Sequence, residues 1–306
     1  MTGAMDGIAT YTTTQILPEW IEQPEEMGSK EKFWFSYPDP SSRWLFKFTE
    51  SGTGQHWAEK IAAEVAAVLS IRCARVEFAE FGGRVGSMTE SFARGGRELI
   101  HGNQVLAGSV ADYNPAKRFH QSDHTVANIW AALDKFFATP DAAKRSKQVF
   151  ASYIVLDAVI GNNDRHHENW GILRRRIGSS WRGYLAPSFD HASSLGRELR
   201  DHGPGKCRER LIEPSRVAAY AANGKGGIFL NESDRHGASQ LRLLEACLEH
   251  DPDLFRPASK KAARFSGHDF ESIVEAVPEC WMTPLARRFA VALITHNLNA
   301  IRRMVD

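Results

Sequence analysis

The chain has 306 residues, of which 42% are hydrophobic and 25% are charged. A chain of this size and composition can bury a substantial core, which excludes an intrinsically disordered protein and indicates two lobes or domains. The formal net charge of +1 excludes a whole-molecule field that would attract nucleic acid or an anionic membrane.

The cysteines and the apolar segments exclude other classes of protein. The four cysteines are widely separated and contain no Cys-x-x-Cys pair, so neither a zinc site nor a disulfide framework is indicated. No apolar run approaches the roughly 18 residues of a membrane span, and residues 1–15 lack the pattern of a signal peptide. We therefore expect a soluble cytoplasmic protein with reduced thiols, no membrane span and no nucleic-acid partner.

The first third of the chain predicts a small β-rich lobe. Residues 1–16 are interpreted as a flexible lead-in and residues 17–107 as the lobe itself. Aromatic strands at Phe33–Tyr37 and Arg43–Phe48 flank a turn rich in proline and serine, which is typical of a β-hairpin. A second hairpin is predicted at 75–92, around Gly82-Gly83, followed by a short strand at 98–105.

A small loop precedes the first aromatic strand. Backbone N–H groups at Gly28 and Ser29 can point at phosphate oxygens, and Lys30 or Lys32 adds positive charge. An ordinary turn explains a single glycine between polar residues equally well. The loop is therefore a candidate phosphate site that depends on the rest of the chain.

Lys47 interrupts an otherwise apolar strand, where a lysine is costly unless an anion accompanies it. The helix predicted at Trp57–Ser70 has an apolar stripe, and Glu64 falls on that stripe. Two charges on faces where charge is unexpected are most simply explained as partners. The alternative is a lysine that reaches solvent from an edge strand and an exposed glutamate.

The second lobe is predicted to be mostly helical and to cover residues 108–306. A polar loop at 108–123 precedes helices at 125–138 and 141–160, and a final helix runs from Pro284 to about Val305.

The segment from Gly161 to Gly171 is a tight polar loop between the second of these helices and a short apolar segment. Within it, Asp164 and Asn169 are five residues apart, which is the spacing of a phosphotransferase catalytic loop. A further acid, Asp190, follows the next apolar segment. A helix C-cap followed by an Asn-rich turn would also explain the first residues of the loop.

The segment that follows Asp190, residues 193–210, is rich in glycine and in charge of both signs. Its basic residues suit an acidic partner or a solvated loop. They are Arg197, Arg200, Lys206, Arg208 and Arg210.

Together, Asp164-Arg165-His166-x-x-Asn169, the later Phe189-Asp190 and the upstream Lys47 resemble the HipA-like serine/threonine kinases of bacteria. The resemblance covers roughly residue 25 to the C-terminus and implies the short form of the family, without an extra N-terminal subdomain. It implies an α+β, protein-kinase-like bilobal fold, with a small antiparallel β-rich N-lobe and a larger, mostly helical C-lobe. Phosphoinositide kinases share the first motif but follow it with Asp-Phe-Gly, so Phe189-Asp190-His191 favours the HipA-like side.

The resemblance implies roles for the acidic and amide residues by position. Asp164 would orient the substrate hydroxyl or accept its proton, and Asn169 and Asp190 would hold Mg²⁺ between the β- and γ-phosphates of ATP. Lys47 would contact the α- and β-phosphates, oriented by Glu64.

The remaining implied roles concern the nucleotide and its surroundings. The loop at 28–30 would cover the phosphates, and Ser29 is the nearest hydroxyl for the autophosphorylation typical of the family. Glu90 and Phe92 would offer backbone groups to adenine. His166 would position Asp164 by hydrogen bonding, because His166 and His167 lack a third metal ligand at a recognisable spacing.

The leading hypothesis is an ATP- and Mg²⁺-dependent protein serine/threonine kinase with an unidentified protein substrate and, as its family suggests, an antitoxin or regulatory partner. A lipid or small-molecule kinase on the same scaffold is the alternative enzyme. A catalytically dead nucleotide-binding module ranks last, because Lys47, Asp164, Asn169 and Asp190 are all competent residues.

Overall fold

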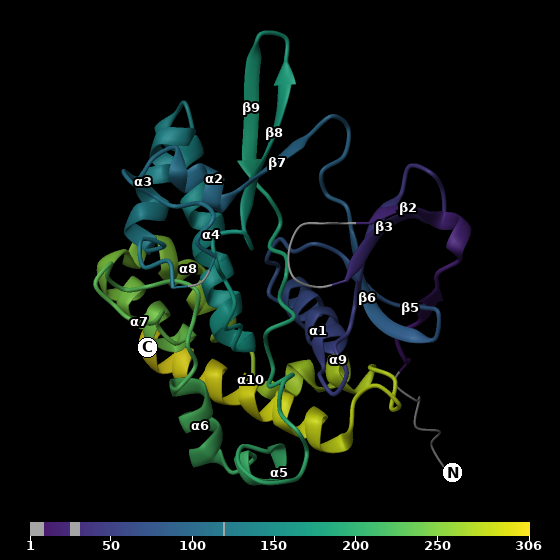
Figure 1. Cartoon of the computed structure of the whole chain (residues 1–306). Helices are drawn as coiled ribbons and strands as arrows, with labels where there is room; N and C mark the ends of the chain where they lie inside the picture. Colours follow the sequence, from purple (N-terminus) through teal and green to yellow (C-terminus); the bar gives the residue numbers. More distant parts are fainter. Residues whose placement is uncertain (1–8, 25–30, 119) are drawn as a thin grey trace, which may run out of the picture.

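The computed structural model describes residues 9–24, 31–118 and 120–306. It divides into a sheet-rich part, on the right in Figure 1, and a helical part on the left and below. The predicted α+β arrangement of a small β-rich lobe and a larger helical lobe is thus observed.

Six strands form the larger sheet, in the spatial order β1-β5-β6-β4-β3-β2. All neighbouring pairs are antiparallel except β1 and β5, which are parallel. Both predicted hairpins are therefore confirmed. The strands are β1 Thr13–Gln15, β2 Ile21–Pro24, β3 Lys32–Ser36, β4 Arg43–Phe48, β5 Val76–Phe81 and β6 Arg84–Glu90.

The expectation of a flexible lead-in over residues 1–16 is wrong for its last part. Thr13 pairs with Phe78 and Gln15 with Glu80, so this segment is an edge strand of the sheet. Ile16 then buries its side chain in the apolar cluster under the sheet. Three short polar residues carried too weak an apolar pattern to predict a strand.

Strand β4 directs Lys47 away from the apolar cluster and towards the candidate site. Trp44, Phe46 and Phe48 are buried on one face, and Lys47 therefore points to the opposite face, as the period of two in a strand requires. Helix α1, Gln55–Val68, packs against β5 and β6, which confirms the predicted helix.

The helical part is built around α4, Pro140–Ile160, and the C-terminal α10, Pro284–Val305, which lie in one large apolar cluster. Among the helices of the described residues, none has the length and apolar character needed to cross a bilayer. The other helices of this part are α2 Gly102–Ala107, α3 Val126–Phe136, α5 Arg208–Leu211, α6 Pro214–Ala222, α7 Gln240–His250, α8 Pro252–Ala262 and α9 Glu271–Glu275.

A second sheet of three strands joins the two parts, in the order β7-β8-β9. Its strands are β7 Glu98–His101, β8 Gly171–Ile177 and β9 Ser180–Leu185, and the β8–β9 hairpin projects at the top of Figure 1. Strand β7 ends earlier than predicted, because α2 begins at Gly102. Since β7 pairs with β8, we propose that the lobes meet at residues 91–97 rather than after residue 107.

Candidate active site

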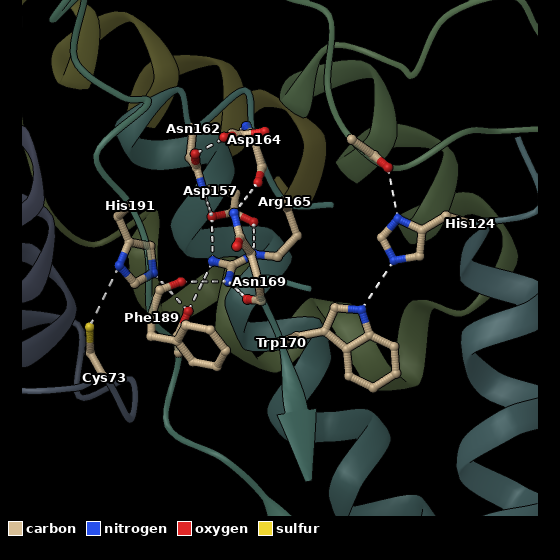
Figure 2. Close-up of polar contacts among 12 residues, drawn as sticks. Cys73, His124, Asp157, Asn162, Asp164, Arg165, Asn169, Trp170, Phe189 and His191 are labelled. Carbon is tan, nitrogen blue, oxygen red and sulfur yellow. Dashed lines mark hydrogen bonds and ion pairs between the residues drawn. The ribbon is translucent and has the colours of Figure 1, made fainter. Parts of the chain in front are cut away.

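The loop that the sequence predicts to be catalytic, residues 161–171 and called the catalytic loop below, begins where α4 ends. Thr139 caps the start of α4 by accepting a hydrogen bond from the Ala142 N–H, and Gly161 ends it in the left-handed conformation, with φ +65°. Asn162 then donates from Nδ2 to Asp157 on the last turn of the helix, at 2.8 Å, and its side-chain oxygen accepts from the Asp164 N–H at 3.2 Å. The loop is therefore folded back onto the helix that delivers it (Figure 2).

Arg165 is the buried centre of this loop. Its guanidinium makes a two-bond contact with the Asp157 carboxylate, with Nε–Oδ2 and Nη2–Oδ1 distances of 2.7 and 2.8 Å. It also donates to the backbone oxygens of Asn169 and Phe189, at 2.6 and 3.2 Å. Burial alone would lower the pKa of Arg165, but Asp157 raises it, so the group stays charged. Arg165 thus fastens the catalytic loop to the segment that carries Asp190.

Asn169 and Asp164 are joined within the loop. The Asn169 Nδ2 donates to the backbone oxygen of Asp164 at 2.7 Å, which leaves its amide oxygen as the atom able to bind a cation. Ser193 lies on the other side, with its hydroxyl 3.5 Å from Asp164 Oδ2. The five-residue spacing predicted from the sequence therefore brings the two side chains to one loop.

Asp190 reaches the site from the end of the segment after β9. Its backbone is left-handed, with φ +60°, a strained conformation for an aspartate and one that is concentrated at functional sites. Its Oδ1 lies 3.1 Å from Lys47 Nζ. Burial lowers the pKa of Lys47, but the charges of Asp190 and Glu59 outweigh burial and raise it. The strand lysine is therefore a permanent cation beside Asp190.

The prediction that Glu64 is the partner of Lys47 is wrong. Glu64 lies 2.7 Å from Lys60, four residues before it on α1, and its side chain is 35% exposed. The carboxylate that faces Lys47 is Glu59, which is 1% exposed. The first nine residues of α1 are all buried, so an apolar stripe could not identify the face that meets β4.

Glu59 also holds the residue after Asp190. Its Oε1 accepts from the His191 backbone N–H at 2.8 Å and lies 3.6 Å from the imidazole Nδ1. Burial opposes a charge on this imidazole, but Cys73 and Glu59 favour it and raise the pKa of His191 to about 9. The Glu59 carboxylate, in turn, has a lowered pKa: burial alone would raise it, but His191 and Lys47 prevail. Figure 2 shows His191 between Cys73 and the segment of Phe189.

Replacing Glu59 with glutamine is expected to slow the phosphoryl transfer that the sequence predicts by about 10- to 100-fold, because Lys47 and His191 lose the charge that positions them. The matched variant Glu64→Gln should change the rate less than twofold, since Lys60 keeps its contact with Glu77 at 2.8 Å. Initial rates and urea unfolding curves of both variants would test this. Equal losses of rate in the two variants would contradict the assignment of Glu59 as the carboxylate that acts on Lys47.

A cavity of about 260 Å³, here the first cavity, lies between the two parts of the molecule. It brings together five predicted residues, which are Lys47, Glu90, Phe92, Asn169 and Asp190. Aromatic and aliphatic side chains close it, among them Trp34, Leu45, Leu99 and Phe189, and the rings of Phe92 and Phe189 lie 5.4 Å apart. Such a mixture of apolar walls and a few convergent polar groups is typical of a small-molecule site.

Lys32, which the sequence offered as an alternative to Lys30 for the charge beside the phosphates, lines this cavity. It is directly opposite Lys47 in the β3–β4 register, and both side chains line the first cavity. Like charges facing each other across a strand pair are destabilising unless an anion lies near them. The pair therefore suits a polyphosphate.

The remaining predicted site residues are not among the described residues of the first cavity. The phosphate loop of Gly28, Ser29 and Lys30 is outside the described residues, so its role stays a prediction. His166 lines a different cavity, and its Nε2 is 3.9 Å from Asp164 Oδ1, too far for a hydrogen bond. Burial, and then Arg118, lower the pKa of His166 to about 3, so it is a neutral neighbour of Asp164.

The basic residues predicted after Asp190 do not form one open patch. Arg208 is buried, with Nη1 2.7 Å from Asp201 Oδ1 and Nη2 3.1 Å from the Gly196 backbone oxygen. Arg197 donates to the Ser193 hydroxyl at 3.4 Å. These two arginines hold the segment in place, which is a structural role.

The donor set suits Mg²⁺ bound together with a nucleotide. Among the described residues, no group of three or more His, Cys, Asp or Glu could form an all-protein metal site. Mg²⁺ is usually held by one or two carboxylates with substrate phosphates, and the Asp190 carboxylate and the Asn169 amide oxygen meet that requirement in one cavity.

The buried His124 makes the stability of the folded protein depend on pH. Its Nδ1 lies 2.7 Å from the Gly227 backbone oxygen, and its Nε2 accepts from the Trp170 indole at 3.1 Å (Figure 2). Burial lowers the pKa of His124 to about 3. Since a second proton on the ring would oppose the Trp170 N–H, the folded protein keeps this imidazole neutral.

The free energy of unfolding is therefore expected to fall as the pH is lowered from about 6.5, where the unfolded chain takes up the proton, towards 3. The slope is about 1.4 kcal/mol per pH unit for one such group. His124→Gln should remove up to that slope in urea unfolding between pH 6.5 and 4.5. His202→Gln is the control, because Glu209 raises the pKa of that exposed imidazole. An unchanged slope in His124→Gln would contradict the prediction.

Comparisons with known proteins agree with this geometry. Residues 26–221 match the family model of the HipA-like C-terminal domain. The crystal structure of the Helicobacter pylori proinflammatory kinase CtkA aligns with a TM-score of 0.76 at 16% identity, over 96% of this chain and 98% of that chain. HipA of Shewanella oneidensis MR-1, solved with HipB and operator DNA, aligns with a TM-score of 0.59 at 15% identity, over 94% of this chain and 67% of that chain. No curated protein sequence matches significantly.

At these identities the structural similarities establish the fold, and the chemistry has to be inferred from the residues of the site. The predicted protein-kinase-like bilobal fold is therefore confirmed.

Proposed function

Because the chain belongs to the family of the HipA-like C-terminal domain, we propose that it is an ATP- and Mg²⁺-dependent protein serine/threonine kinase. The observation that carries the proposal is the meeting of Lys47, Asn169 and Asp190 in the first cavity, with Asp164 on the same loop as Asn169. Phosphoryl transfer needs cations on the phosphates and a carboxylate that orients the attacking hydroxyl.

In the proposed reaction, each group has one role. Lys47 and Lys32 bind the phosphates, while Asn169 and Asp190 would hold Mg²⁺, which would supply positive charge at the transferred group. Asp164 orients the substrate hydroxyl and accepts its proton. The apolar walls at Phe92 and Phe189 enclose adenine.

The test is the transfer of labelled γ-phosphate from ATP with Mg²⁺ and no added substrate, comparing the native chain with Asp164→Asn. Label on the native chain alone supports a protein kinase that autophosphorylates, and mapping the label tests Ser29 as the acceptor. If ATP binds but no protein is labelled, even in a lysate, the protein-kinase proposal fails. Lipids and small hydroxy compounds would then be the acceptors to test.

A regulatory partner is a further part of the proposal. HipA of Shewanella oneidensis was solved in a complex with HipB and operator DNA. By this likeness we expect a regulatory protein for the present chain, and co-purification from cells is the measurement that would identify it.

A further inference from the structure

A second cavity, of about 210 Å³, lies on the other side of the catalytic loop. Its walls come from the loop before α3, from the catalytic loop and from the segment between α6 and α7. The residues that matter below are Arg118, Asp164, His167, Lys225 and Gly227. Asp164 is thus in the wall of this cavity, while Asn169 and Asp190 line the first one.

The wall formed by the segment between α6 and α7 is held firmly against the catalytic loop. A Cβ atom on Gly227 would lie 2.7 Å from the backbone of Arg165 and His166, so only glycine permits this approach. The Gly227 backbone oxygen lies 2.7 Å from Nδ1 of the buried His124. The preceding residue is also held, because the Gly226 N–H donates a hydrogen bond of 2.9 Å to the Ala238 backbone oxygen. The cavity is therefore built into the fold.

His167 brings an unused polar atom to this cavity. Its side chain is 1% exposed, and its Nδ1 lies 2.7 Å from the Tyr113 hydroxyl. Its Nε2 is buried and has no hydrogen-bond partner among the described residues. A buried polar atom without a partner destabilises the protein, so a water molecule or a ligand atom that binds this Nε2 would stabilise the folded chain.

The charged groups of the second cavity are mostly cationic. Arg118 and Lys225 line it, the buried imidazoles of His124 and His166 are neutral, and Asp164 is its one carboxylate among the described lining residues. Lys225 is exposed at the mouth of the cavity. Since opposite charge at the rim guides binding, this lining favours a ligand with negative charge.

The two cavities meet at Arg118, which lines both. Its Nε lies 3.5 Å from Glu168 Oε2 and its Nη2 lies 3.2 Å from His166 Nε2. A hydroxyl that enters the second cavity would therefore lie beside Asp164, while the nucleotide phosphates would lie beside Asn169 and Asp190 in the first cavity. In-line transfer needs the acceptor and the phosphates on different sides of the transferred group.

We propose that the second cavity binds the phosphate acceptor, and that this acceptor is a serine or threonine peptide with a carboxylate or phosphate group beside the reacting hydroxyl. The proposal rests on the kinase function proposed above. Lys225 binds the flanking negative charge and determines the specificity. The acceptor oxygen forms the new bond to the γ-phosphorus as the bond to the ADP oxygen breaks, and the hydroxyl proton passes to Asp164.

The test uses four serine peptides of one sequence, in which the flanking residues are aspartate, phosphoserine, alanine or lysine. Values of kcat/KM are measured with the native chain, with Lys225→Glu and with the control Lys144→Glu, an exposed lysine of α4 that lines neither cavity. We expect the native chain to prefer the acidic peptides over the lysine peptide roughly tenfold or more. Lys225→Glu should remove this preference, and Lys144→Glu should keep it. The aspartate and phosphoserine peptides distinguish the two sources of negative charge.

Autophosphorylation and ATP binding are measured in the same samples, so that a failure of the acceptor assignment can be distinguished from a failure of the kinase proposal. If the native chain labels itself but shows no preference for acidic peptides, or if Lys225→Glu keeps the preference, the acceptor assignment is overturned and the kinase proposal stands. If neither the chain nor any peptide is labelled, the kinase proposal fails, and this inference fails with it.

Discussion

Replacing Arg165 with methionine is expected to lower the free energy of unfolding by about 3–5 kcal/mol, which is the usual cost of leaving one partner of a buried ion pair behind. Both side chains of the pair with Asp157 are buried, at 2% and 3% exposure. The variant would leave the Asp157 carboxylate without its cation inside the apolar cluster around α4. Two backbone oxygens of the loop, at Asn169 and Phe189, would also lose their donor.

Urea unfolding of Arg165→Met measures this effect, with Arg208→Met as the matched control. Arg208 is also buried, but its partner Asp201 is 22% exposed and can be hydrated after the change. Adding Asp157→Asn to Arg165→Met should recover part of the loss, because the unpaired charge is then gone. A smaller loss for Arg165→Met than for Arg208→Met would show that the buried pair does not hold the loop.

The centre of the site could be predicted from sequence because its residues follow local rules. A helix C-cap at Gly161 is readable from the glycine itself, and the spacing of Asp164 and Asn169 is fixed within one loop. Lys47 was predicted by a different signal, a charge that breaks the alternation of an apolar strand. In both cases the information lies within a few neighbouring residues.

Glu59 could not be predicted in the same way. It is on the same helix as Glu64, but the choice between them depends on how α1 is rotated against β4 and on the position of His191, 132 residues further along the chain. Because α1 is buried on most of its surface, hydrophobicity does not distinguish its faces. The structure resolves the choice through contacts that are distant in sequence.

The second cavity depends even more on distant contacts. It combines Arg118, the catalytic loop and the segment at Lys225, none of which carries a recognised motif for an acceptor site. The β8–β9 hairpin, by contrast, has a signal in the sequence, because Gly178-Ser179 is a two-residue turn between its strands.

Asp164→Asn is expected to slow phosphoryl transfer by about 10²- to 10⁴-fold, the usual contribution of one positioned acid or base. The substitution keeps the size of the side chain and the backbone contacts to Asn162 and Asn169, so the loop should fold normally. Because Asp164 lies in the wall of the second cavity, nucleotide affinity should change little. Only the orientation and deprotonation of the acceptor hydroxyl are lost.

The measurement combines single-turnover transfer rates with ATP titrations, and Asp134→Asn is the matched control. Asp134 is an exposed carboxylate that pairs with Lys147 at 2.6 Å, away from both cavities, so its variant should transfer phosphate at the native rate. If Asp164→Asn lost ATP binding and transfer together, Asp164 would belong to the nucleotide site. If transfer continued at the native rate, another group would have to accept the proton, and the imidazoles of the second cavity would be the residues to replace next.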